Sequence, residues 1–164
     1  MKNLKQLLPA LIIASAAFLY ACGGSADQAS SSADNTSASA SNTSADVDPD
    51  AKSDSKGIGK FTSVQLGAID DAMADKGKVV FTAKCSACHK VTGDKVVGPG
   101  LKGVTQRRTP EWIMNQITNP VEMEQKDPVG KALLAKHLTQ MTFQNVSDDE
   151  TRQLLEYLRQ NDKQ

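Results

Sequence analysis

Apolar residues from position 58 onward recur three or four places apart, and no stretch alternates between apolar and polar residues as a half-buried strand would. This spacing is typical of amphipathic helices. It predicts an all-α fold of four or so helices, which we expect over residues 70–85, 109–120, 127–138 and 147–160.

Three of these helices have a recognisable start. Thr-Pro at 109–110 and Asp-Pro at 127–128 each place a capping side chain before a proline, which helices accept in their first turn. Ser147 and Glu150 have the spacing of a capping box. The Asn-Pro pair at 119–120 should end the second helix, because proline disfavours helical backbone in the residue before it.

The segment between the first two predicted helices, residues 89–108, is rich in glycine. A loop of about 20 residues without structure of its own is uncommon in a compact domain unless it encloses something. We therefore expect this segment to wrap a bound group.

The first 22 residues have the pattern of an export signal. A positive start is followed by a short apolar run, which is below the roughly 20 residues that cross a bilayer. The run ends in "LYAC", Leu19 to Cys22, which resembles a bacterial lipobox. The resemblance implies cleavage before Cys22 and a lipid on its thiol. An ordinary cleaved signal with a spare cysteine is the alternative.

Residues 23–57 consist mainly of Ser, Ala, Asp, Asn and Thr, so they have little apolar surface to bury. We expect a disordered tether here, followed by one domain over residues 58–164. From Ile58 the chain holds 15 basic and 13 acidic residues, a balance that does not favour nucleic-acid binding.

Cys85, Cys88 and His89 form the pentapeptide "CSACH". A structural zinc ion would need four ligands, and the chain has no second pair of closely spaced cysteines. A redox dithiol normally lies at a strand-to-helix junction, and a disulfide over so short a loop adds little stability. The pattern instead matches covalent haem attachment, with a thiol for each vinyl group and an imidazole for the iron.

With these residues the sequence resembles the small monohaem c-type cytochromes of class I, over about residues 77–158. The family's first helix carries a glycine, an aromatic residue and the first haem cysteine at the spacing of Gly77, Phe81 and Cys85. Its last helix carries the pattern matched by Leu154, Tyr157 and Leu158. The resemblance implies that the two helices cross where Gly77, which has no Cβ, lets them approach closely.

The resemblance also implies further contacts with the haem. The "GPGLKGV" segment matches the family's loop after the haem histidine, in which Pro99 presents its carbonyl to the far nitrogen of His89. Leu101 should form part of the apolar wall around the porphyrin. Trp112 and either Arg107 or Arg108 are candidates to bind the haem propionates, because a buried carboxylate needs a donor or a cation.

The sixth iron ligand should come from the C-terminal half. Met141 is preferred, because the family places its ligand methionine in a loop before the last helix, although Thr142 stands where many members have proline. Met123 and His137 are the alternatives, and Met114 is expected in the core. We expect iron bound by His89 and Met141.

We therefore expect one covalent haem c and an electron carrier that faces the bacterial periplasm, anchored to the inner or outer membrane by lipid on Cys22. Its partners would be redox proteins, such as an oxidase, a reductase or a bc-type complex. We expect a monomer, and no enzyme, because no catalytic base or nucleophile is evident. The alternatives are a five-coordinate haem sensor or peroxidase-like enzyme, and a haem subunit of a larger respiratory complex.

Overall fold

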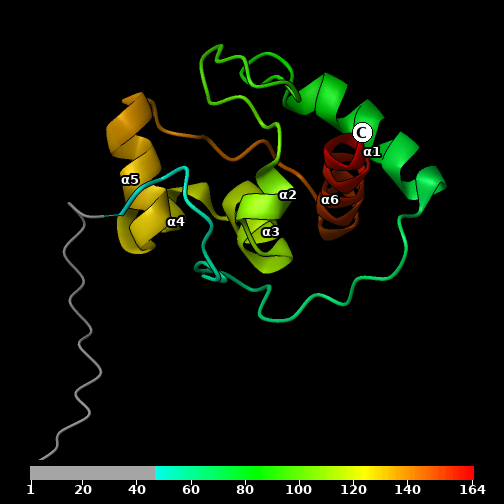
Figure 1. Ribbon diagram of the computed structural model, residues 1–164, viewed down its shortest axis with the longest axis horizontal. Coiled ribbons are helices and arrows are strands. Elements are labelled where there is room, and N and C mark those ends of the chain that lie inside the picture. The colour runs from blue at the N-terminus through cyan, green and yellow to red at the C-terminus, as the bar shows by residue number, and fades with distance from the viewer. Residues whose placement is uncertain (1–46) are drawn as a thin grey trace, which may run out of the picture. The chain divides into compact units, whose positions relative to one another are not determined.

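The computed structural model describes residues 47–164, and the predicted signal peptide and most of the tether lie outside this range. The described part is helical, as predicted, with α3 lying between the α4/α5 pair and the α1/α6 pair (Figure 1). Among these residues, no helix is long and apolar enough to cross a membrane. The helices are α1 (Asp71–Lys84), α2 (Val104–Arg107), α3 (Pro110–Thr118), α4 (Pro120–Lys126), α5 (Pro128–His137) and α6 (Asp148–Lys163).

The predicted caps are present. The Thr109 hydroxyl accepts a hydrogen bond from the Trp112 N–H, and the Asp127 carboxylate accepts one from the Gly130 N–H. Ser147 and Glu150 form both bonds of the capping box. These local bonds satisfy N–H groups that the first turn of a helix leaves free, which explains why three helix starts could be located from sequence.

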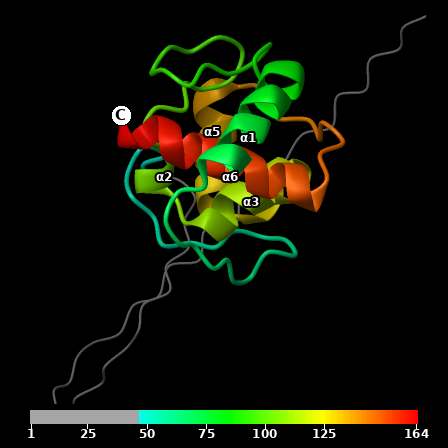
Figure 2. The ribbon, with the colours of Figure 1, turned by 90° about the vertical axis from the view of Figure 1, so that its right-hand side faces the viewer.

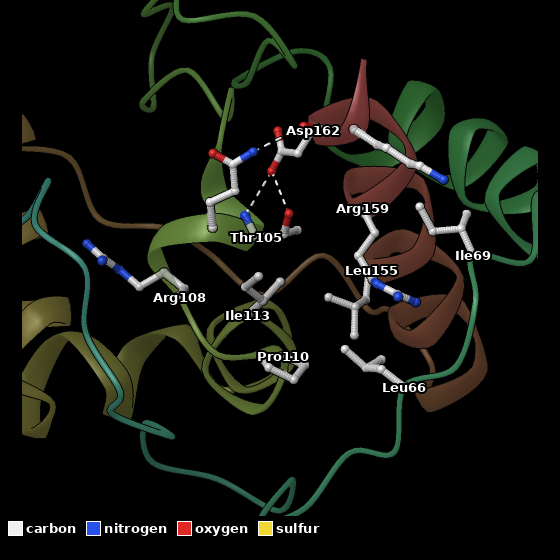
Figure 3. Close-up of a pocket in the computed structure, with 11 residues that line it drawn as sticks. Leu66, Ile69, Thr105, Arg108, Pro110, Ile113, Leu155, Arg159 and Asp162 are labelled. Atoms are coloured by element: carbon white, nitrogen blue, oxygen red, sulfur yellow. Dashed lines mark hydrogen bonds between the residues drawn. The ribbon is translucent and has the colours of Figure 1, made fainter.

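The structure contains two short helices that the sequence did not predict. Pro120 does not simply end α3; it also begins α4, because proline at the first position of a helix gives up an N–H that would be unpaired there. The other, α2, lies in the glycine-rich segment. The start of α2 is bonded to α6. The Asp162 carboxylate accepts the Gly103 N–H at 2.6 Å and the Thr105 N–H at 2.9 Å, and Figure 3 shows the bond to Thr105.

Helices α1 and α6 cross at Gly77, as predicted (Figure 2). A Cβ atom added at Gly77 would lie 2.0 Å from the backbone oxygen of Gln153, so only glycine allows this approach. Phe81 and Tyr157 pack beside the crossing, with ring centroids 5.6 Å apart. The crossing fixes the end of α1, where Cys85 follows.

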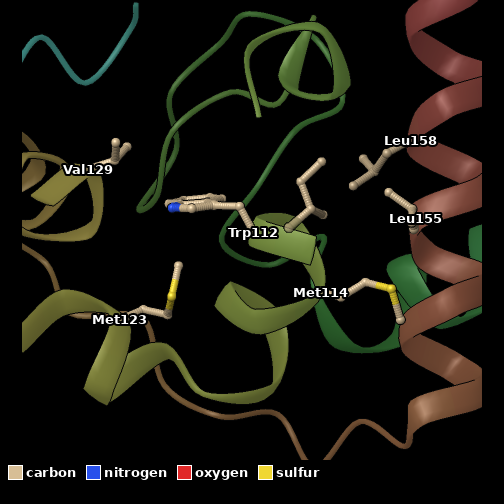
Figure 4. Close-up of a cluster of buried hydrophobic side chains, with 7 residues drawn as sticks. Trp112, Met114, Met123, Val129, Leu155 and Leu158 are labelled. Atoms are coloured by element: carbon tan, nitrogen blue, oxygen red, sulfur yellow. The ribbon is translucent and has the colours of Figure 1, made fainter. Parts of the chain in front are cut away.

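Trp112 and the other buried residues of α3 form an apolar cluster with α4, α5 and α6, which Figure 4 shows. Met123 is fully buried and is directed toward Trp112, whereas Met114 is directed toward α6. Both methionines therefore belong to the core. The cluster comprises Trp112, Ile113, Met114, Met123, Val129, Leu155 and Leu158. Phe81 of α1 belongs to a second cluster, with Val146 and Leu154.

Residues 47–57 were assigned to the tether, but the structure places them against the domain. The Ser55 hydroxyl donates to Asp127 at 2.7 Å, and the Ser55 carbonyl accepts from Thr109 at 2.7 Å. The Arg108 guanidinium donates to the carbonyls of Pro49 and Ala51. Composition did not reveal this strap, residues 47–57, because most of the bonds that hold it use backbone carbonyls, which every residue carries.

Candidate functional site: a cavity lined by two thiols, an imidazole and a thioether

A cavity of about 280 Å³ lies between the end of α1, the glycine-rich segment, α3, α5 and the segment before α6. It brings together every site residue that the sequence predicted, although these residues lie up to 56 positions apart. The lining includes Cys85, Cys88, His89, Pro99, Leu101, Arg107, Arg108, Trp112 and Met141.

The turn after α1 positions the two thiols and the imidazole. The Cys85 carbonyl accepts bonds from the Cys88 and His89 N–H groups at 3.1 and 2.9 Å, which closes one tight turn. The cysteines form no disulfide with each other. Within residues 47–164, no three His, Cys, Asp or Glu side chains gather as a metal site of the zinc type would require.

The ring of His89 is held by the loop that follows it. Nδ1 lies 2.9 Å from the Pro99 carbonyl oxygen, as predicted. Because a carbonyl can only accept, Nδ1 carries the proton and Nε2 keeps its lone pair for a metal. A Cβ on Gly98 would lie 2.4 Å from the ring, so glycine there leaves room for the imidazole.

Burial raises the pKa of the Cys85 thiol to about 11, outweighing the opposing effect of the Lys84 charge. Before haem attachment, the free Cys85 thiol is therefore neutral at physiological pH. A neutral sulfur is compatible with the apolar wall that it shares with Phe81 and Leu101.

Met141 also lines the cavity, from the segment between α5 and α6. Its sulfur lies 3.7 Å from Nε2 of Gln116. Its backbone N–H donates to Oε1 of Glu124 at 2.7 Å. Sequence reasoning missed both partners, and no local signal marks them, because each is an ordinary polar residue within a helix.

The other candidate ligands differ in position. Met123 and Met114 do not line the cavity, and the Met123 sulfur accepts the Ile58 N–H at 2.9 Å. His137 does line it, with Nδ1 buried and without a hydrogen-bond partner among the described residues. Burial, followed by the Lys95 charge, lowers the pKa of His137, so this ring tends to be neutral.

Two of the proposed propionate donors have other acceptors. An indole has a single N–H, and that of Trp112 donates to Asp127 at 2.9 Å, so Trp112 contributes apolar surface rather than a propionate bond. Arg108 donates to the strap and to the Arg107 carbonyl. Within residues 47–164, the Arg107 side chain makes one hydrogen bond, to the Lys102 carbonyl, and retains further donors.

The polar atoms of the cavity also fit a bound cofactor. Three buried atoms lack a hydrogen-bond partner within residues 47–164, namely Gln116 Oε1, Glu124 Oε2 and His137 Nδ1, and all three residues line this cavity. Buried polar groups are nearly always paired, so such a cluster marks a place where another group belongs. Two thiols, an oriented imidazole and a thioether on a largely apolar wall match an iron porphyrin.

Fold and site together define a small class I c-type cytochrome. The family model for Cytochrome c matches residues 74–162, and the chain belongs to this family. It carries haem c bound covalently through Cys85 and Cys88. Cytochrome c homologues are electron carriers, and this chain is accordingly a haem-based electron carrier.

Several relatives support this assignment. The chain is 36% identical over 69 residues to a cytochrome c-553-like protein of Synechocystis sp., covering 40% of this chain and 66% of that protein. It is 30% identical over 118 residues to cytochrome c2 iso-2 of Rhodospirillum centenum, covering 56% of this chain and 97% of that one. A solved cytochrome c from Rhodothermus marinus is 42% identical, with a TM-score of 0.62, over 64% of this chain and 90% of that chain.

Proposed function

We propose that this carrier holds its iron between His89 and Met141 and works as a one-electron shuttle outside the cytoplasm, tethered to a membrane through Cys22. The observation that carries the ligand assignment is the position of Met141. Its side chain lines the same cavity as His89, whereas the sulfurs of Met123 and Met114 are packed in the core. His137 also lines the cavity and is the competing ligand.

Haem c supplies an iron that alternates between Fe(II) and Fe(III), so it takes up or releases one electron. The protein contributes two ligand side chains that are fixed before the electron arrives. Pro99 fixes the ring of His89, and helices α3 and α4 contact Met141. Because these contacts need not change with the iron charge, little reorganisation accompanies transfer. With His89 and Met141 as its ligands, the haem would have a higher reduction potential than a haem held by two imidazoles.

The ligand assignment is tested with Met141→Ala, with Met123→Leu as the matched control. The oxidised protein should show the weak absorption band at the red end that is typical of Met–Fe(III) coordination. Met141→Ala should lose this band, lower the reduction potential and bind carbon monoxide in the reduced state, whereas Met123→Leu should do none of these. If Met141→Ala keeps the band, the assignment is wrong. If wild-type protein binds carbon monoxide at neutral pH, a sensor or peroxidase-like role gains support.

The membrane proposal rests on the "LYAC" motif, because Cys22 lies outside the described residues. A lipid on Cys22 and the polar segment after it would let the domain move between a donor and an acceptor near a bacterial membrane. Cys22→Ser should release the haem-containing protein into the soluble periplasmic fraction. An unchanged membrane fraction would refute lipid anchoring.

Lysines near the cavity are proposed to guide acidic redox partners, such as an oxidase, a reductase or a bc-type complex. Lys90, Lys95 and Lys102 are exposed. Lys84, which also lines the cavity, is instead bonded to Glu150 at 2.9 Å and to the Asn145 carbonyl. Electrostatic docking predicts that electron-transfer rates fall as ionic strength rises. A rate independent of salt would refute this part of the proposal.

A further inference from the structure

The segment that carries Met141 has no helical structure between the end of α5 and the start of α6. Within residues 47–164, the hydrogen bonds that reach it from helices other than the flanking α5 and α6 come from Lys84 in α1, Gln116 in α3 and Glu124 in α4. Only the last two act on Met141 itself. The position of the proposed ligand therefore depends on a small number of side chains that come from elsewhere in the fold.

Glu124 is the unusual member of this set. Its side chain belongs to a residue that is only 6% exposed, and no basic side chain within residues 47–164 forms an ion pair with it. Oε1 accepts the Met141 N–H, and Oε2 is buried with no partner in that range. Burying a carboxylate with so few donors is unfavourable, so the fold retains it against a cost in stability. The bond to Met141 is the specific contact that it provides.

Helix α4 presents Glu124 from a rigid position. The preceding residue, Met123, is fully buried and accepts the Ile58 N–H through its sulfur. On the α5 side, a Cβ on Gly130 would lie 2.3 Å from the Met123 carbonyl oxygen, so the two helices are in backbone contact. The backbone of Glu124 is thus held by the core, whereas the buried core residue of the Met141 segment, Val146, lies five positions beyond Met141.

We propose that Glu124 is a positioning residue for the axial ligand. Its Oε1 fixes the backbone N–H of Met141 so that the thioether stays directed into the cavity, and the bond thereby favours the iron-bound state of Met141 over the detached state. This inference rests on the proposed ligation by Met141. It predicts that a variant without the Glu124 acceptor still has Met141 as its iron ligand but that Met141 detaches more easily.

The test compares four full-length, haem-loaded proteins: wild type, Glu124→Leu, Glu124→Gln and Glu122→Leu. The first variant removes the acceptor while keeping side-chain bulk, and the second keeps an amide oxygen that can still accept the Met141 N–H. The third is the matched control, an acid on the same helix that bonds to Asn119 and Lys126 and does not line the cavity. Imidazole serves as the probe that competes with the thioether for the ferric iron.

Two quantities are measured, namely the imidazole concentration at half-displacement of the red-end band and the exchange rate of the Met141 amide hydrogen in the reduced protein. Glu124→Leu should lower this imidazole concentration and raise the exchange rate, each by about three- to tenfold. This is the change in an equilibrium constant that the loss of one hydrogen bond produces. Glu124→Gln and Glu122→Leu should stay within about twofold of wild type. If Glu124→Leu does not bind haem, Glu124→Asp replaces it in the test, because its shorter side chain moves the carboxylate away from the Met141 N–H by one methylene.

The inference is overturned if Glu124→Leu matches wild type in both measurements, if Glu122→Leu shifts as much, or if Glu124→Gln behaves like Glu124→Leu. Failure of the underlying ligand assignment gives a different result. In that case wild type itself lacks the red-end band, and the amide exchange rate still reports whether Glu124 holds Met141.

Discussion

Gly77→Ala tests whether the approach of α1 to α6 is set by the missing side chain. The added Cβ would lie 2.0 Å from the Gln153 oxygen, 2.5 Å from its carbonyl carbon and 2.9 Å from the Tyr157 Cβ. Real Cβ atoms essentially never come within 3.0 Å of such neighbours. The two nearest atoms belong to the backbone of α6 and cannot rotate away. The helices must therefore separate by about 1 Å at the crossing.

The energetic cost follows from this displacement. A gap of that size forfeits roughly a quarter to a half of each dispersion contact across the interface, and overpacking of a core typically costs about 1–3 kcal/mol. The backbone clash places Gly77→Ala at the upper end, about 3 kcal/mol. Alanine recovers roughly 1 kcal/mol through its better helix propensity. The net loss in the free energy of unfolding should be about 2 kcal/mol.

Guanidinium denaturation followed by far-UV circular dichroism measures this loss. Gly67→Ala is the matched control, because nothing lies within 4 Å of its added Cβ. The control should change the free energy of unfolding by less than about 0.5 kcal/mol. If Gly77→Ala is as stable as wild type, the helices can reseat at no cost, and the argument that glycine sets their distance is refuted.

Two further predictions concern buried carboxylates. Asp127→Ala should lower the free energy of unfolding by about 3 kcal/mol, because it leaves the buried Trp112 N–H unpaired and removes the N-cap of α5. Asp127→Asn keeps an acceptor and should lose less stability in the same denaturation experiment. Equal losses for the two variants would contradict this prediction. Burial raises the pKa of Glu156, but the Asp70 N–H and then two neighbouring arginines more than offset it, so the pKa lies below the usual 4.5. A lowered folded-state pKa stabilises the protein above pH 4.5, and this contribution is lost as the pH falls through the lowered value. Glu156→Gln should therefore lose less stability on acidification than wild type in pH-dependent denaturation, and an unchanged acid dependence would contradict this.

Local signals were sufficient where the physics is local. A capping side chain and a proline lie within four residues of the bonds they make, so the starts of α3, α5 and α6 were correctly predicted. The prediction for Pro120 was incomplete for a related reason, because the residues around it indicate the end of α3 but not the start of α4. Proline both stops one helix and starts the next, and the sequence near Asn119 does not say which.

The strap and the contacts of Trp112 could not be predicted, because their partners are distant in sequence. Residues 49 and 51 are held by Arg108 through carbonyl groups that any residue would offer. The sequence does not indicate which acceptor binds the Trp112 N–H, and the packing of α5 against α3 brings Asp127 to it. Side-chain chemistry limits the kind of partner, and packing selects the individual atom.

By itself, the sequence determined the attachment chemistry of this protein: two thiols and an imidazole in five residues, and a glycine and an aromatic residue at fixed distances before them. These are contacts within one or two turns of chain, whose geometry backbone sterics constrain. Tertiary structure decided which residues distant in sequence from this pentapeptide also line the cavity. The sequence favoured Met141 and left Met123 and His137 as alternatives, and helix packing buries Met123 in the core and leaves His137 and Met141 at the cavity. That sorting depends on the distances between helices, which no single segment encodes.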